Sequence, residues 1–251
     1  MAARRLTSRK GRHEAGLFLA EGAQAVREAL RAKAVIEVFA TADALARHEQ
    51  LLAEVDVGQI SAKDAQALSE TVTPQGLVAV CRMAQPSAAE VLDGAPRLLV
   101  VLVEPNDPGN LGTIIRTADA AGADAVVVDG GVDPYNGKVV RASVGTLFHL
   151  PVVSCAVEDL LAGAAQRGIA ALATTGRASA TLDDLATDGT LARPTAWLFG
   201  NEAHGLPASV LAAADREVRV PIYGRAESLN LAVAAGICLY ASARAQRAAR
   251  G

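Results

Sequence analysis

From residue 98 onward, short apolar runs alternate with segments of helical period. Runs of this kind predict strands, and apolar positions repeating about every 3.6 residues predict helices. Their alternation predicts an α/β fold with a parallel sheet covered by helices on both faces. The expected strands are 98–103, 125–129, 152–153, 170–173, 196–199 and 218–220, and the expected helices are 112–121, 138–143, 157–167 and a terminal helix from Leu231.

The first part of the chain predicts a smaller α/β module. Its expected helices are 21–34, 43–54 and 61–71, and its expected strands are 35–39 and 76–81. Residues 85–96 contain two prolines between strand patterns, which is typical of a linker. We therefore expect a boundary near residue 95, with one domain at 1–94 and another at 95–251.

Polar side chains gather at three places where an apolar segment meets a loop or a helix start. The carboxyl ends of parallel strands share one edge of a sheet, and ligands bind at that edge. Ser228 or Asn230 can cap the terminal helix, and its free N–H groups favour an anion or a polar ligand edge. The polar residues at these junctions are Asn110 and Arg116, then Glu202 between Gly200 and Gly205, then Arg225, Glu227, Ser228 and Asn230.

Three ordered motifs at these junctions resemble those of the SpoU-type (TrmH-like) RNA ribose 2′-O-methyltransferases of the SPOUT superfamily. They are Asn110-x-Gly112-x-Ile114-x-Arg116-Thr-Ala118, the run Leu198-Phe-Gly-Asn-Glu-Ala-His-Gly-Leu206, and Ile222-x6-Leu229-Asn230-Leu231-x-Val233-Ala-x5-Tyr240. Residues 8–22 also resemble the opening of the small RNA-binding domain that often precedes the catalytic domain. The resemblance implies a ribosomal-protein L30e-like N-terminal domain and a SPOUT domain with a C-terminal trefoil knot.

The resemblance implies S-adenosyl-L-methionine as cofactor and RNA, with ribosomal RNA expected first, as substrate. Thr174, Gly200, Ile222 and Leu231 would line the cofactor pocket, largely through main-chain groups; the alternatives are core packing for Ile222 and Leu231 and a turn for Gly200. Arg116 would fix a phosphate or stabilise the developing alkoxide, and its alternative is a surface ion pair. Asn110 would orient Arg116 or the ribose, Glu202 would hold the loop or pair with an arginine, and Ser228 and Asn230 would bind the substrate hydroxyl or its phosphate.

Charge and cysteine content narrow the possible partners. The formal net charge is −3, but residues 4–12 carry five basic side chains and no acid, which favours phosphate contacts at this end. Three widely spaced cysteines and four scattered histidines predict neither a disulfide framework nor a metal site. No apolar run approaches the roughly 20 residues of a membrane span, and the apolar stretch 17–20 is too short for a signal peptide. We therefore expect a cytoplasmic protein without metal.

Other functional classes fit less well. The chain lacks the glycine spacing of a Rossmann dehydrogenase, the G-x-x-x-x-G-K-[ST] of a P-loop and the G-x-S-x-G of a serine hydrolase. Three alternatives remain open: a transfer RNA 2′-O-methyltransferase, an antibiotic-resistance methyltransferase, and a non-catalytic RNA-binding module with the same fold.

Small apolar residues recur at three- and four-residue intervals along the last helix, which predicts a face for close helix packing. The resemblance favours a homodimer in which this face meets a second copy and Arg116 reaches the partner's cofactor pocket. Packing on the chain's own sheet is the alternative. The face consists of Leu231, Ala234, Ala235, Cys238, Leu239 and Ser242.

Overall fold

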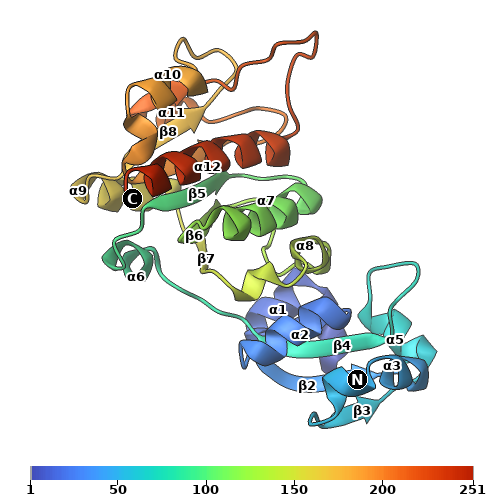
Figure 1. The fold of residues 1–251 in the computed structure, drawn as a ribbon. Coiled ribbons are helices and arrows are strands. Elements are labelled where there is room, and N and C mark those ends of the chain that lie inside the picture. Colours follow the sequence, from blue (N-terminus) through green and yellow to red (C-terminus); the bar gives the residue numbers. More distant parts are fainter. Residues whose placement is uncertain (1, 251) are drawn as a thin grey trace. The chain divides into compact units, whose positions relative to one another are not determined.

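All five strand pairings in a six-stranded sheet are parallel, and the strand order is β10-β8-β9-β5-β6-β7. Figure 1 labels β5, β6, β7 and β8 of this sheet. The computed structural model describes residues 2–250. This sheet belongs to a unit formed by Gln85–Val132 and the chain from Leu150 onward, here termed the six-stranded unit. The strands are β5 (Leu98–Val103), β6 (Ala125–Asp129), β7 (Val152–Ser154), β8 (Ala170–Thr174), β9 (Thr195–Phe199) and β10 (Arg216–Val218).

Helices cover both faces of this sheet, as the alternating pattern predicts. The terminal helix α12 packs on β5 and β9 and lies beside α7, α10 and the short 3-10 helix η3, whereas α9 packs on β6 and β8 and lies beside α6 and α11. The helices are α6 (Ala88–Asp93), α7 (Pro108–Ala121), α9 (Val157–Gln166), α10 (Leu182–Thr187), α11 (Ala208–Ala213), α12 (Leu231–Ala248) and η3 (Thr190–Ala192).

The central strands are buried on both faces, which is why they have almost no polar side chains. All six residues of β5 and all five of β9 are buried. Leu99 and Leu198 belong to the core beneath α9 and α11. On the α12 side, the Trp197 indole N–H donates a 2.9 Å hydrogen bond to the Ser242 hydroxyl, which fixes the helix to β9.

The other unit consists of the chain up to Ala84 together with Asp133–His149, and is here termed the four-stranded unit. Its sheet has the order β1-β4-β2-β3, with antiparallel β1/β4 and β4/β2 pairs and a parallel β2/β3 pair. The elements are η1 (Ala2–Thr7), α1 (Arg9–Ala15), β1 (Leu17–Glu21), α2 (Ala23–Arg31), β2 (Val35–Ala40), α3 (Ala42–Arg47), α4 (Glu49–Leu52), β3 (Val57–Gln59), α5 (Ala62–Leu68), β4 (Leu77–Arg82), α8 (Gly137–Ser143) and η2 (Thr146–Phe148).

Residues 133–149 pack within the four-stranded unit, although the sequence predicts that they belong to the alternating strands and helices of the six-stranded unit. The Arg12 guanidinium binds the Asp133 carboxylate with two hydrogen bonds of 2.9 and 2.6 Å, and both side chains are almost fully buried. Phe18 stacks with Phe148 and lies 4.7 Å from the ring of Tyr135, between centroids. This compact division differs from the expected boundary near residue 95, because it ends the first stretch at Ala84 and adds a later segment.

Three local expectations are corrected by the structure. The expected linker 85–96 contains α6, which begins with a capping box between Ser87 and Glu90. The expected helix 43–54 is divided at His48 into α3 and α4. Arg12 is not part of a basic surface, because its charge is used in the buried pair with Asp133. Among the described residues, no helix is long and apolar enough to cross a membrane.

Most of the small-residue face of α12 packs on its own unit, and only Leu231 and Ala234 of its six residues are partly exposed. Ala235, Cys238, Leu239 and Ser242 are fully buried. The exposed side of α12 instead presents a different apolar stripe, Val233, Ile237 and Tyr240, whose side chains are 51%, 39% and 48% exposed.

Candidate functional site

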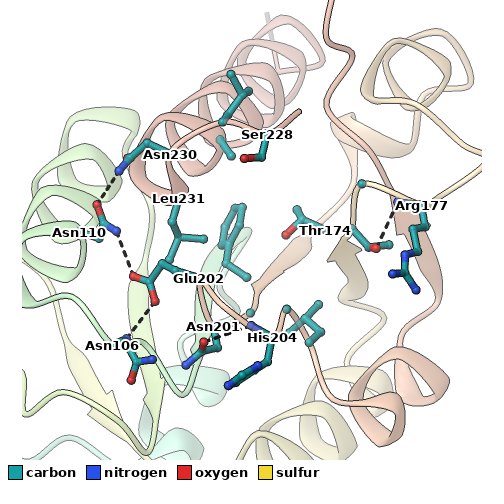
Figure 2. A pocket seen from close by; sticks show the side chains of 18 of the residues that line it. Asn106, Asn110, Thr174, Arg177, Asn201, Glu202, His204, Ser228, Asn230 and Leu231 are labelled. Atoms are coloured by element: carbon teal, nitrogen blue, oxygen red, sulfur yellow. Dashed lines mark hydrogen bonds between the residues drawn. The ribbon is translucent and has the colours of Figure 1, made fainter. Parts of the chain in front are cut away.

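A cavity of about 940 Å³ lies in the six-stranded unit, where the loops after β5, β8 and β9 meet the start of α12 (Figure 2). These three strands are neighbours in the sheet and run parallel, so their carboxyl ends lie at one edge. The structure therefore joins all three sequence motifs at one cavity. Seven of the nine predicted site residues line it: Asn110, Thr174, Gly200, Glu202, Ser228, Asn230 and Leu231.

Gly200 is required by close packing of the loop after β9. A Cβ atom at this position would lie 2.2 Å from the backbone carbon of Gly205 and 2.3 Å from the backbone nitrogen of Leu206. Asn201 and Gly205 exchange two backbone hydrogen bonds, which close the loop into a narrow turn. The absence of a side chain at Gly200 keeps the main chain at the cavity wall.

The loop after β9 is attached to the loop after β5 by buried amide groups. The Asn201 side chain is 8% exposed and donates a 2.7 Å hydrogen bond to the Glu104 carbonyl oxygen. Its own carbonyl oxygen accepts bonds from the backbone N–H groups of Ala203 and His204. Glu104 has φ +49°, an uncommon value for a residue with a side chain, so the strand β5 ends in a strained turn at the cavity.

A chain of hydrogen bonds runs along one side of the cavity, from α12 through α7 to the β9 loop (Figure 2). The Asn230 amide donates to the Asn110 carbonyl oxygen over 2.9 Å, and the Asn110 amide donates to the Glu202 carboxylate over 3.0 Å. The same carboxylate accepts the backbone N–H groups of Asn106 at 3.1 Å and Asp107 at 3.4 Å. Each motif therefore orients a side chain of another.

The pKa of Glu202 reflects this environment. Partial burial alone would raise it, but hydrogen bonds from the Asn110 amide and from backbone N–H groups outweigh burial and hold the pKa below its ordinary value. Glu202 is therefore a carboxylate at neutral pH.

Of the two candidate caps of α12, Ser228 and Asn230, the structure shows that Asn230 is the cap. Its side-chain oxygen accepts the backbone N–H groups of Ala232 and Val233, so it caps α12. Ser228 lines the cavity with an exposed hydroxyl that has no hydrogen-bond partner within residues 2–250. The Thr174 hydroxyl donates to the Leu198 carbonyl oxygen over 2.8 Å, which leaves its main chain at the wall.

Two predicted residues do not line the cavity. Arg116 lies on the exposed side of α7, and no ion-pair partner for it exists within the described chain. Ile222 is 37% exposed in the loop between β10 and α12, in a stretch from 222 to 228 that is exposed throughout. Arg225 and Glu227 of the same stretch also lie outside the cavity lining.

Several cavity residues were not predicted from the sequence. Asn106 and Asn201 lie within or beside the recognised motifs, so the motifs themselves were a usable signal for them. Arg177 and Glu217 carry no such signal, because they reach the cavity only through the pairing of β8 with β10.

The family model described as the SpoU rRNA Methylase family matches residues 97–240, which is more than half of the chain. This chain belongs to the SpoU rRNA methylase family. A second model, the MRM3-like substrate binding domain, matches residues 1–79. The family segment contains every residue that lines the cavity.

Curated relatives and solved structures of this family extend over nearly the whole chain. The 23S rRNA (guanosine(2553)-2′-O)-methyltransferase RlmP of Bacillus subtilis is 35% identical, covering 94% of this chain and 92% of the relative. The structure of the SpoU methyltransferase AviRb from Streptomyces viridochromogenes in complex with AdoMet has a TM-score of 0.82 at 32% identity, covering 98% and 96% of the two chains. An AdoMet-bound rRNA methyltransferase from Sinorhizobium meliloti has a TM-score of 0.81 at 32% identity, covering 97% and 93%.

Proposed function

We propose that this protein transfers a methyl group from S-adenosylmethionine to a ribose 2′-hydroxyl of ribosomal RNA. The observation that carries the proposal is the Asn230–Asn110–Glu202 hydrogen-bond chain at the edge of the parallel sheet, next to the bare main chain of Gly200. The relatives are named as methyltransferases, and two of them as rRNA methyltransferases, which supports the reaction class and favours ribosomal over transfer RNA.

The cavity fits the cofactor in size and chemistry. Its volume of about 940 Å³ lies near the upper end of the range for small-molecule sites, so it has room for the cofactor together with a target nucleoside. An adenine ring needs apolar walls and main-chain donors and acceptors. Phe199, Leu206 and Leu231 supply apolar surface, and Gly200 exposes backbone between them.

Side chains of the cavity are placed to position the ribose hydroxyl that accepts the methyl group. When bound, S-adenosylmethionine supplies an electrophilic methyl group on a sulfonium sulfur. The free Ser228 hydroxyl and the Asn230 amide are placed to hydrogen-bond a ribose hydroxyl, and Asn110 is oriented by its bonds to both Asn230 and Glu202. Arg116 would stabilise the negative charge that develops on the attacking oxygen through charge-assisted hydrogen bonds.

Arg116 requires a second chain to act in this way, and we propose a homodimer. α7 and α12 lie side by side, with Gly236 packed toward Thr117. Arg116 is exposed on α7, and the apolar stripe Val233, Ile237 and Tyr240 is exposed on α12, so burial against a second copy would cover this stripe. A two-fold interface here would bring Arg116 of each subunit toward the cavity of the other.

Two finer assignments belong to the same proposal. Residues 1–94 would bind the RNA substrate, which is supported by the exposed side chains of Arg4, Arg5, Arg9 and Lys10 and by the substrate-binding model that matches there. The trefoil knot is supported by the position of β9 between β8 and β5 and by the convergence of the loops after β8 and β9 with the segment before α12.

Two measurements test the reaction. The purified protein should bind S-adenosylmethionine without added metal, which calorimetry detects, and should incorporate labelled methyl groups into ribosomal RNA at a ribose 2′-oxygen. Mapping 2′-O-methyl positions in RNA from a deletion strain identifies the nucleotide. Cofactor binding without transfer to any RNA would instead favour a non-catalytic module.

Subunit mixing tests the homodimer. Arg116→Ala and Asn230→Ala proteins should each be inactive, whereas a mixed dimer keeps one site with both residues intact. An equimolar mixture after subunit exchange should recover about a quarter of wild-type activity, because half the dimers are mixed and each has one working site of two. No recovery despite proven exchange would show that each chain builds its site alone.

A further inference from the structure

A second hollow of about 600 Å³ adjoins the cavity, and Arg177, Leu211 and Glu217 line both. It lies along the loop after β8 and the edge strand β10, within the six-stranded unit. In Figure 2 Arg177 is on the opposite side of the cavity from Asn110 and Asn230. The cavity therefore continues away from the groups proposed to hold the ribose hydroxyl.

Arg177 and Glu217 are charges without partners at the junction of the two hollows. Neighbouring charges are satisfied: the Asp215 carboxylate accepts the Ala171 backbone N–H over 2.7 Å, and Arg216 forms an ion pair with Asp188. The side chains of Arg177 and Glu217, by contrast, have no hydrogen bond or ion pair with any residue from 2 to 250, including each other.

The backbone holds these two residues in a fixed relation. The Thr175 N–H donates to the Val218 carbonyl oxygen over 3.0 Å, and the Arg219 N–H donates to the Ala180 carbonyl oxygen over 3.0 Å. These two bonds brace both residues, because Arg177 lies between 175 and 180 and Glu217 immediately precedes Val218. The Arg177 backbone N–H also donates to the Thr175 hydroxyl oxygen. Two opposite charges are thus presented together by a braced pair of segments.

We propose that Arg177 binds the carboxylate and Glu217 the ammonium group of the amino-acid end of the methyl donor. This inference rests on the proposed function, and it assigns a subsite to the part of the ligand that the apolar walls do not explain. A guanidinium matches a carboxylate through two parallel hydrogen bonds, and a carboxylate matches an ammonium through charge-assisted ones. An RNA phosphate would suit Arg177 but would be repelled by Glu217.

Calorimetry with two ligands that share the thioadenosine part tests the subsite. S-adenosylhomocysteine carries the amino-acid end, and 5′-methylthioadenosine lacks it. In the chain with both units intact, Arg177→Gln and Glu217→Gln should each weaken S-adenosylhomocysteine binding by about tenfold and change methylthioadenosine binding by less than about twofold. Arg219→Gln, two residues from Glu217 but outside the lining of both hollows, is the matched control and should leave both affinities unchanged.

Each other outcome overturns the inference. Equal weakening of both ligands would mean that the variants disturb the cavity wall and not an amino-acid subsite. Unchanged S-adenosylhomocysteine affinity with weaker RNA binding by Arg177→Gln would assign Arg177 to a phosphate. If the wild-type protein bound neither ligand, the proposed function itself would fail, which is distinguishable because no variant is needed to observe it.

Discussion

Arg116 has a proposed catalytic role that its position in a single chain does not explain. Its side chain is exposed on α7 and does not line the cavity. Arg116→Ala should lower the rate of methyl transfer by about 100-fold or more, since one preorganised charged donor is removed. Cofactor affinity should stay nearly unchanged, because the cavity wall is intact. Single-turnover kinetics and calorimetry measure the two quantities, and near-wild-type turnover would contradict the assignment.

Glu202 gives a pH dependence with a definite sign. Its folded-state pKa lies below the ordinary value, so its contribution to stability is fully present above the unfolded pKa of about 4.3 and is lost as pH falls through the lower folded pKa. The difference in unfolding free energy between wild type and Glu202→Gln should therefore be constant from neutral pH to about pH 5 and shrink below about pH 4.

Urea unfolding at a series of pH values measures this difference. Glu227→Gln is the control, because Glu227 is exposed and has no hydrogen bond or ion pair within the described chain. A gap between wild type and Glu202→Gln that persists unchanged to about pH 3 would show that the hydrogen bonds do not favour the charged form.

Motif resemblance predicted some of the cavity residues that lie within motifs, including Asn110 and Glu202, but it missed Asn201 and did not predict the interactions between them. The sequence left Ser228 and Asn230 as equal candidates for the helix cap, because both precede the apolar helix by a suitable distance. Only the structure shows that Asn230 caps α12 while its amide also binds Asn110. Arg177 lies outside the motifs, so local sequence carried no sign of it.

At the scale of elements, the segment carrying α8 is joined to the rest of the four-stranded unit by a buried ion pair. Asp133→Ala would leave the Arg12 guanidinium, whose side chain is 3% exposed, without its carboxylate, which should cost about 3–5 kcal/mol of unfolding free energy. The exposed pair of Asp93 with Arg167 is a matched control, and Asp93→Ala should cost less than about 1 kcal/mol. Denaturant unfolding measures both.

Equal effects of these two substitutions would mean that burial does not distinguish the pairs. The replacement of both Arg12 and Asp133 by apolar residues of similar volume should be far less damaging than either single change, because no buried charge is then left unpaired.

Element prediction succeeded where the signal was local. The helix expected at 138–143 is present as α8. It packs against β1 of the four-stranded unit although it follows β6 of the six-stranded unit, and its own helical periodicity could not indicate this. The helix α6 was missed although Ser87 and Glu90 have the capping-box spacing, because two prolines nearby favoured a linker. β3 has three residues, too short for a pattern.

For the whole molecule, the parallel sheet was predicted because strands buried on both faces are continuous apolar runs, as in β5. The strand order was not predicted, because the periodicity of apolar residues indicates which positions are buried but not which strands are adjacent in the sheet. That order is what brings β8 beside β9 and β10 and so adds Arg177 and Glu217 to the cavity. The division into two units also changes how the RNA-binding role is tested. Deleting residues 1–94 would remove the partners of residues 133–149, so substitutions on the intact chain are a cleaner test.

RNA binding should depend on the cations that the four-stranded unit exposes. Arg4, Arg5 and Lys10 are exposed on η1 and α1, and the pair of Lys10 with Glu14 at 3.8 Å is itself exposed to solvent, whereas Arg12 is neutralised by the buried Asp133 and should release no counterion. Each cation that neutralises a phosphate adds about 0.7 to 0.9 to the slope of log K against log salt, so replacing all three by Gln should lower the slope by about 2. Titrations between about 50 and 200 mM salt measure the slope.

Arg47→Gln, an exposed cation on α3, is the control. An unchanged slope in the triple variant would show that RNA binds a different surface, and cofactor affinity should be the same in every variant because none of these residues lines the cavity.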